Sequence, residues 1–99
     1  MFYEIAQIDI KPGTQQQFEA GVAKAAPLFQ RAKGCHGMEL QHSVEHPEHY
    51  FLVVKWATVE DHTVSFRESA DFQSWRALVG EFFASPPQVQ HTSVAVQGF

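Results

Sequence analysis

The segment Tyr50–Ala57 restricts most strongly how this chain can fold. It reads YFLVVKWA, a run of β-branched and aromatic residues that is typical of a strand. Side chains alternate between the two faces of a strand, so Phe51 and Val53 lie on the same face. The opposite face carries the four residues Tyr50, Leu52, Val54 and Trp56. Both faces are therefore apolar. Helices can cover one face of a sheet, and in a small domain we expect a second subunit to cover the other.

The length and composition of the chain support this expectation. Its 99 residues leave room for one domain, residues 1–99, and the single Cys excludes an internal disulfide. Hydrophobic residues make up 44% of the chain and aromatic residues 13%, which excludes intrinsic disorder. Charged residues make up only 18%, less than the usual fraction of about a quarter. The sequence predicts one small apolar core that benefits from a partner subunit.

The charge of the chain excludes two classes of partner. A formal net charge of −4 makes nucleic acid and anionic membrane surfaces poor partners. No apolar run approaches the length of a membrane span. The segment Met1–Ile10 has no basic region before an apolar stretch, so we expect neither a signal peptide nor a transit peptide. The expected location is the cytoplasm.

Hydrophobic periodicity predicts the order of the elements. The first strand, Phe2–Ile10, places Glu4 on the same face as Ala6 and Ile8. Three residues mark expected helix starts. Thr14 and Thr58 are each followed three residues later by a polar residue, and Ser69 stands before the next helical stripe. The predicted order is a strand at Phe2–Ile10, a helix from Thr14 to Gly34, a hairpin of strands Cys35–Glu45 and Tyr50–Ala57, a short helix at Thr58–Arg67, a longer helix from Ser69 to Ser85 and a strand at Val89–Gln97. This is the α+β, ferredoxin-like β-α-β-β-α-β pattern, a four-stranded antiparallel sheet with helices on one face.

Four short motifs resemble those of a known family. They are EIAQIDIKPG at residues 4–13, Gly34-Cys35-x-Gly37, Trp56-x5-His62 and SPP-x-V at residues 85–89. Together with the order of elements, they make the chain from Phe2 to Val96 resemble an antibiotic biosynthesis monooxygenase (ABM) domain. The resemblance implies a homodimer in which two ferredoxin-like sheets pack face to face into an α/β barrel. Such packing would cover the second apolar face of the Tyr50–Ala57 strand.

The resemblance also implies a class of reaction. The family includes cofactor-free oxygenases of polyphenolic substrates, haem-degrading enzymes and domains of unassigned role. The leading hypothesis is a monooxygenase, an oxidoreductase that oxidises a small aromatic or polyphenolic ligand without a cofactor. A non-enzymatic ligand-binding protein and a haem-binding protein are the alternatives.

One absence limits how much of the family chemistry applies here. The quinone-forming and haem-degrading members use a catalytic Asn, and this sequence contains no Asn. Their mechanism therefore does not transfer whole. The haem-degrading members also carry a Trp roughly where this chain has His62, which weakens the haem alternative.

His62 is the candidate catalytic residue. It lies four residues before Phe66 on a predicted short helix, so the two side chains share one helix face. Oxygenation of a phenol without metal or flavin needs a base that generates the phenolate, and an imidazole with an ordinary pKa of about 6.5 is suitable near neutral pH. We interpret His62 as a base or an orienting hydrogen-bond donor. The alternative is a histidine that only packs between helix and sheet.

Six aromatic residues are candidates for the wall of a substrate pocket between the sheet and the helices. They are Trp56, Phe66, Phe72, Trp75, Phe82 and Phe83. Their flat side chains are suited to a flat aromatic ligand. The same residue types also build an ordinary core, so the sequence leaves both interpretations open.

The predicted hairpin link has the residue types of a metal site but not its pattern. His46-x-x-His49 lies close to Glu48 and His42. Polar, solvent-facing residues are normal in such a link, and no second Cys or paired carboxylate completes a ligand set. We therefore expect no metal site.

Three further residues have polar or reactive side chains. Cys35 and His36 are adjacent on a predicted strand and point to opposite faces, so they do not form a nucleophile and its base. Cys35 is interpreted as a packing residue. Arg67 and Arg76 could meet an anionic group of a substrate, although on a helix a solvated charge is the simpler interpretation.

Overall fold

The computed structural model describes residues Met1 to Phe99 and confirms the ferredoxin-like β-α-β-β-α-β order. As predicted, the second helical segment consists of two pieces. The elements are β1 (Phe2–Asp9), α1 (Gln15–Gln30), β2 (Cys35–His42), β3 (His49–Trp56), the π-helical turn η1 (Asp61–Phe66), α2 (Ala70–Val79), the 3-10 turn η2 (Gly80–Phe82) and β4 (Gln88–Thr92).

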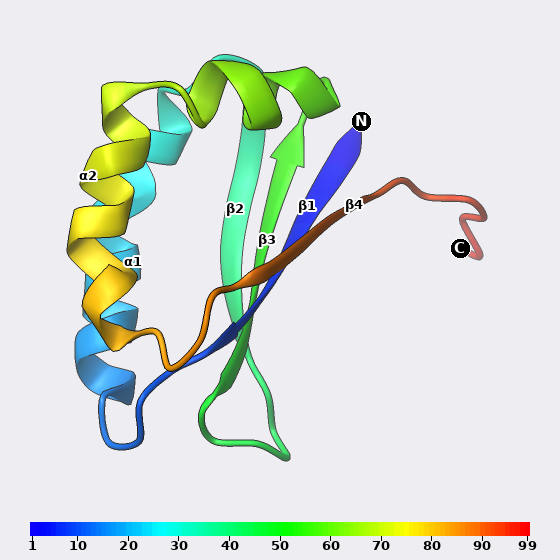
Figure 1. Ribbon diagram of the computed structural model, residues 1–99. Helices are drawn as coiled ribbons and strands as arrows, with labels where there is room; N and C mark the ends of the chain where they lie inside the picture. The colour runs from blue at the N-terminus through cyan, green and yellow to red at the C-terminus, as the bar shows by residue number, and fades with distance from the viewer.

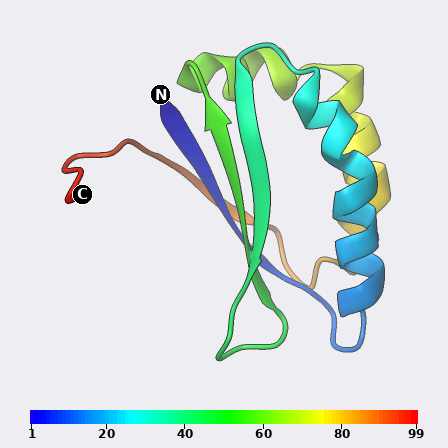
Figure 2. The same ribbon diagram turned by 180° about the vertical axis from the view of Figure 1, so that it is seen from behind.

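The four strands form one antiparallel sheet in the order β2-β3-β1-β4. Figures 1 and 2 show that α1 and α2 lie side by side on the same face of this sheet. The central strands are β3 and β1, which pair along their whole length from Phe2 opposite Trp56 to Asp9 opposite His49. Neither helix is long and apolar enough to cross a bilayer.

Strict alternation along the two central strands creates the core. Every second residue of β3, from Tyr50 to Trp56, is fully buried beneath the helices. Ala6 and Ile8 of β1 join them on the same side. The helices contribute the apolar stripes that the sequence predicts, with Phe18, Val22, Ala25 and Phe29 from α1 and Trp75 and Val79 from α2. The sheet and the two helices therefore share one hydrophobic core.

The opposite face of the sheet has no helix on it (Figures 1 and 2). Tyr3 and Ile5 of β1 lie on this open face beside Phe51 and Val53 of β3, and all four are half-buried. The prediction that this central strand is apolar on both faces is therefore confirmed. Within one chain, only its helix-facing side is covered.

The last strand is shorter than the sequence predicts. We expected Val89–Gln97, but β4 ends at Thr92. β4 pairs only with β1, and Thr92 lies opposite Tyr3, next to the first residue of that strand. Beyond Thr92, β1 has only Phe2 left to pair with this strand. Residues 93–99 leave the sheet instead, with Val94 and Val96 exposed (Figure 1).

The predicted helix starts have different outcomes. Thr58 accepts a hydrogen bond from the backbone N–H of Asp61 (3.0 Å), and Ser69 accepts one from Phe72 (3.2 Å), as capping requires. Thr14 does not cap α1 in this way. Its hydroxyl donates to the carbonyl oxygen of Lys11 (2.6 Å), so it closes the preceding turn.

Gly34 joins the end of α1 to β2 in a conformation that needs glycine. Its φ of +76° lies in the left-handed region. Its carbonyl oxygen accepts a hydrogen bond from Ala57 (2.7 Å), which holds the start of β2 against the end of β3. The Asp61 carboxylate lies so close that a Cβ atom at position 34 would collide with it. Asp61 is the first residue of η1, the turn that carries His62, so this turn begins against Gly34.

Replacing Gly34 by Ala should lower the free energy of unfolding by about 2 kcal/mol or more, because it combines backbone strain with the clash against Asp61. Gly13 is a matched control. It also has a positive φ, +81°, but has open space around it. Gly13→Ala should cost about 1 kcal/mol from strain alone. Urea unfolding of both variants measures the difference, and equal losses would contradict the role of the Asp61 contact.

Candidate active site

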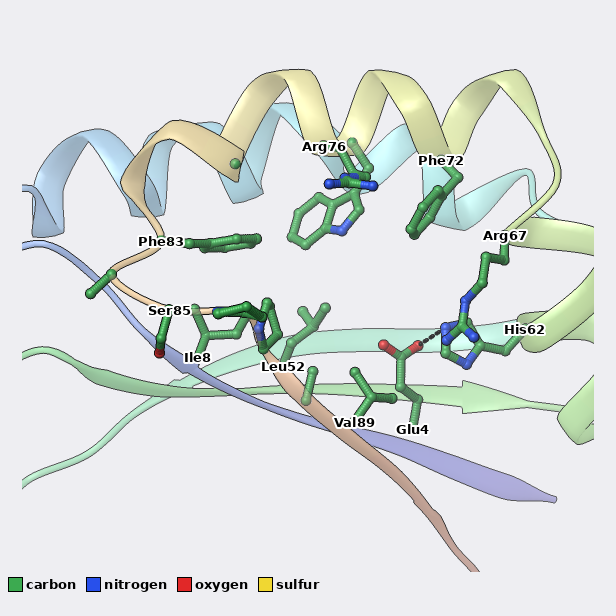
Figure 3. Close-up of a pocket in the computed structure, with 16 residues that line it drawn as sticks. Glu4, Ile8, Leu52, His62, Arg67, Phe72, Arg76, Phe83, Ser85 and Val89 are labelled. Carbon is green, nitrogen blue, oxygen red and sulfur yellow. Dashed lines mark ion pairs between the residues drawn. The ribbon is translucent and has the colours of Figure 1, made fainter.

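A cavity of about 790 Å3 opens between the helix-facing side of the sheet and α2 (Figure 3). Its floor comes from β1, β3 and β4, and its roof comes from α2 and the segment that follows. It is lined by Glu4, Ala6, Ile8, Leu52, His62, Arg67, Phe72, Trp75, Arg76, Gly80, Phe83, Ala84, Ser85, Pro86, Pro87 and Val89. This volume is typical of a small-molecule site.

Backbone hydrogen bonds hold the segment after α2 against the sheet. Lys11 donates to the carbonyl oxygen of Phe82, and Ala84 donates to that of Asp9, each at 2.8 Å. Phe83 lies between these two bonds and faces the cavity (Figure 3). The end of β1 thus positions one aromatic side chain of the cavity wall.

Glu4 is the polar centre of the cavity. It is only 5% exposed, although its neighbours on this face of β1 are apolar. Its Oε1 atom accepts a hydrogen bond from the indole N–H of Trp56 (3.1 Å) and lies 3.3 Å from Nε2 of His62. The second oxygen of the carboxyl group has no protein partner and points into the cavity (Figure 3). One oxygen is held by the protein and the other can meet a ligand.

Two histidines continue this polar arrangement. The ring of His62 stacks on that of Trp56, with centroids 5.4 Å apart and an angle of 18°. Its Nδ1 atom lies 2.8 Å from Nε2 of His91, the residue of β4 that pairs with Glu4. A neutral imidazole has one N–H group and one acceptor. Donation from Nε2 of His91 to Nδ1 of His62 needs no charge on either ring, and it leaves the N–H group of His62 on Nε2, the atom 3.3 Å from Glu4.

Burial changes the acid-base properties of both groups. Desolvation raises the pKa of Glu4 from 4.5 to about 7, against the lowering effects of the Trp56 hydrogen bond and the charge of Arg67. Desolvation lowers the pKa of His62 from 6.5 to about 4, and the charges of Arg67 and His91 act in the same direction. Near pH 7, His62 is neutral and Glu4 exchanges a proton. The carboxyl group is thus better suited than the imidazole to take up a proton near neutrality.

The sequence profile described as "Antibiotic biosynthesis monooxygenase" matches residues 1–78. The chain belongs to the antibiotic biosynthesis monooxygenase family. It is 40% identical over 91 residues to the uncharacterized protein YczJ of Bacillus subtilis (strain 168), which covers 92% of this chain and 96% of the relative.

Solved structures agree with this assignment to the ABM family. A Bordetella bronchiseptica protein named after the same family is 58% identical, with a TM-score of 0.95 over 96% of this chain and 97% of that one. A Nitrosomonas europaea protein, also named after the family, has a TM-score of 0.83 at 18% identity, over 95% of this chain and 89% of that one. The second similarity shows the fold alone.

In this ABM-family protein, the predicted aromatic residues divide into two groups. Phe72, Trp75 and Phe83 line the cavity. The others lie outside its wall: Trp56 and Phe66 are buried in the core, and Phe82 packs partly buried against it. Trp56 still contacts the site through Glu4 and His62.

Sequence reasoning singled out His62 but not its partners. Glu4 had a visible signal, because it is an acidic residue on the apolar face of a predicted strand. His91 had none, since only the pairing of β4 with β1 brings it to Glu4. Arg67 and Arg76, which the sequence left as solvated charges or anion contacts, both line the cavity.

The remaining histidines of the hairpin do not gather around one point. His42 donates from Nε2 to the carbonyl oxygen of Pro47 (2.7 Å), and His49 lies 2.7 Å from Oδ1 of Asp9. No group of three His, Cys, Asp or Glu side chains is arranged so that it could hold a metal ion.

Replacing Glu4 by Gln should change how stability depends on pH. The folded-state pKa of Glu4 is raised from 4.5 to about 7, so its contribution to stability is fully present below pH 4.5 and is lost as pH rises towards 7. Gln keeps a hydrogen-bonding side chain but does not titrate. Relative to Glu4→Gln, the wild type should lose up to about 3 kcal/mol across this range. Urea unfolding at several pH values measures the difference.

The exposed Glu45 in the hairpin link provides the control, and Glu45→Gln should follow the wild type at each pH. His62 contributes with the opposite sign, because its lowered pKa makes stability rise with pH between about 4 and 6.5. Wild type and Glu4→Gln share that contribution, so their difference isolates Glu4. Parallel curves for these two proteins would contradict the raised pKa.

Proposed function

We propose that this protein is a monooxygenase that oxidises a small aromatic or polyphenolic compound without a bound cofactor. One observation carries the proposal: a buried carboxyl group, Glu4, has one free oxygen aimed into a cavity with an aromatic wall. Membership of the ABM family is consistent with this reaction class.

The shape and lining of the cavity support an aromatic substrate. Ile8 of β1 and Leu52 of β3 form an apolar floor, and Phe72 approaches from α2 on the opposite side (Figure 3). A flat ring held between these surfaces buries apolar area on both of its faces. A hydroxyl group on its edge can then reach the carboxyl group of Glu4.

The chemistry requires removal of the phenolic proton. In the proposed step, the substrate hydroxyl gives its proton to the free oxygen of ionised Glu4, and the resulting phenolate is electron-rich enough to reduce O2. The neutral ring of His62 holds Glu4 in position and is not itself the proton acceptor. Arg67, whose positive charge acts on both groups, lies where it favours the phenolate.

The overall reaction balances without another reductant. A phenol with a free para carbon and one O2 molecule give a quinone and one water molecule. One oxygen atom enters the ring as the new carbonyl group, and the other leaves as water. The substrate supplies all four electrons that O2 accepts. The protein contributes the base, the orientation and a dry cavity.

Oxygen uptake with 1-naphthol-like and anthrone-like substrates, whose phenol forms have a free para carbon, tests this function. Glu4→Gln should lower kcat by about 100-fold or more, because it removes the proton acceptor. His62→Ala should cause a smaller loss and His36→Ala, an exposed site on β2, none. The wild-type rate should rise with pH through about 7 as Glu4 ionises.

Two results would oppose this function. Equal rates for the wild type and Glu4→Gln would remove Glu4 as the base. Saturable ligand binding without any oxygen uptake would favour the alternative of a non-enzymatic ligand-binding protein.

We also propose that two copies associate through the open faces of their sheets. Tyr3, Ile5, Phe51 and Val53 place apolar side chains on a face that nothing in one chain covers. Face-to-face packing of two such sheets removes this surface from water. The exposed Val94 and Val96 beyond β4 add apolar side chains that a second copy can cover.

Light scattering tests the dimer. The native protein should have twice the 11.2 kDa mass of one chain. Val53→Asp should shift it towards the monomer, because it places a charge in the centre of the open face. Val64→Asp is the matched control on the exposed surface of η1 and should stay dimeric. A native protein that scatters as a folded monomer at micromolar concentration would overturn the proposal.

A further inference from the structure

Two arginines of the cavity lack a carboxylate partner. The chain is acidic overall, with eleven Asp and Glu residues against seven Lys and Arg, yet Arg67 and Arg76 both line the cavity. Neither guanidinium group forms a salt bridge or a side-chain hydrogen bond. By contrast, Arg31 binds both carboxylate oxygens of Asp71, at 2.8 and 2.7 Å.

The two arginines occupy different parts of the cavity. Figure 3 shows Arg67 reaching towards His62 and Glu4, whereas Arg76 approaches from α2 above. Arg76 lies four residues after Phe72 and so shares its face of α2. Arg67 lies at the polar end of the site, beside His62 and Glu4. Arg76 adds a second positive charge that the proposed deprotonation does not use.

We propose that the substrate carries a carboxylate group, held by Arg76, on the same small aromatic framework whose hydroxyl group faces Glu4. This inference rests on the proposed oxygenase function, because it names the substrate class of that site. The planar fork of a guanidinium group can bind a carboxylate through two parallel hydrogen bonds. The ligand class is a phenol with a carboxylate at the far end of its ring system.

The cost of displaced water explains why an anionic ligand is preferred. Arg67 and Arg76 are both exposed residues that line the cavity, so a ring bound there displaces part of the water around their guanidinium groups. A neutral ligand does not replace the hydrogen bonds that the guanidinium groups lose when this water leaves. A carboxylate replaces the lost water contacts with charge-assisted hydrogen bonds. The same cavity should therefore discriminate between an acid and its ester.

Calorimetric titration with a matched ligand pair tests the inference. We would use 5-hydroxy-2-naphthoic acid and its methyl ester, which have a free carbon para to the hydroxyl group and differ in the charge on the other ring. The acid should bind the native protein about tenfold more tightly than the ester. Arg76→Gln should remove this preference by weakening the acid alone, and Arg76→Lys should restore part of it.

Arg31→Gln is the matched control, because it makes the same charge change at an arginine already paired with Asp71. It should keep the preference for the acid. Circular dichroism shows whether each variant is folded. Equal affinities of acid and ester for the native protein, or an unchanged preference in folded Arg76→Gln, would overturn the carboxylate assignment.

Oxygen uptake in the same samples separates the two proposals. Binding of the acid that depends on Arg76, without oxygen consumption, supports the anionic ligand class and overturns the oxygenase function. Oxidation of both ligands with equal affinities supports the oxygenase function and overturns the carboxylate.

Discussion

The pairing of β1 with β3 on one side and β4 on the other is the constraint on which both the core and the site depend. It aligns the buried residues of two central strands beneath the helices, which gives the core its continuous apolar layer. The same register sets His91 opposite Glu4 and brings the Trp56 indole within reach of its carboxyl group. A shift of one residue would turn Glu4 to the open face and abolish the site.

Burying a carboxyl group in this layer has a cost that the surrounding residues reduce but do not remove. Trp56 and His62 direct polar groups at one oxygen, while the other faces the cavity. The result is a group that exchanges its proton near neutral pH rather than a fully paired structural carboxylate. A neutral His62 supports it without introducing a second buried charge.

Much of the fold could be predicted because its signals are local. The alternation in β3, the helical stripe of α1 and the cap at Ser69 each involve residues close together in the chain. The end of β4 could not be predicted in this way. Val94 and Val96 continue the strand pattern, but β1 offers no further backbone to pair with them.

The sequence by itself determined the order of elements, the apolar face of β1 and the aromatic residues available to the cavity, because periodicity and turn chemistry are local properties. It also singled out His62. Only the tertiary structure decided that Glu4, His62 and His91 form one polar cluster, because strand pairing joins residues from opposite ends of the chain. The burial that alters their pKa values likewise depends on packing from several elements at once.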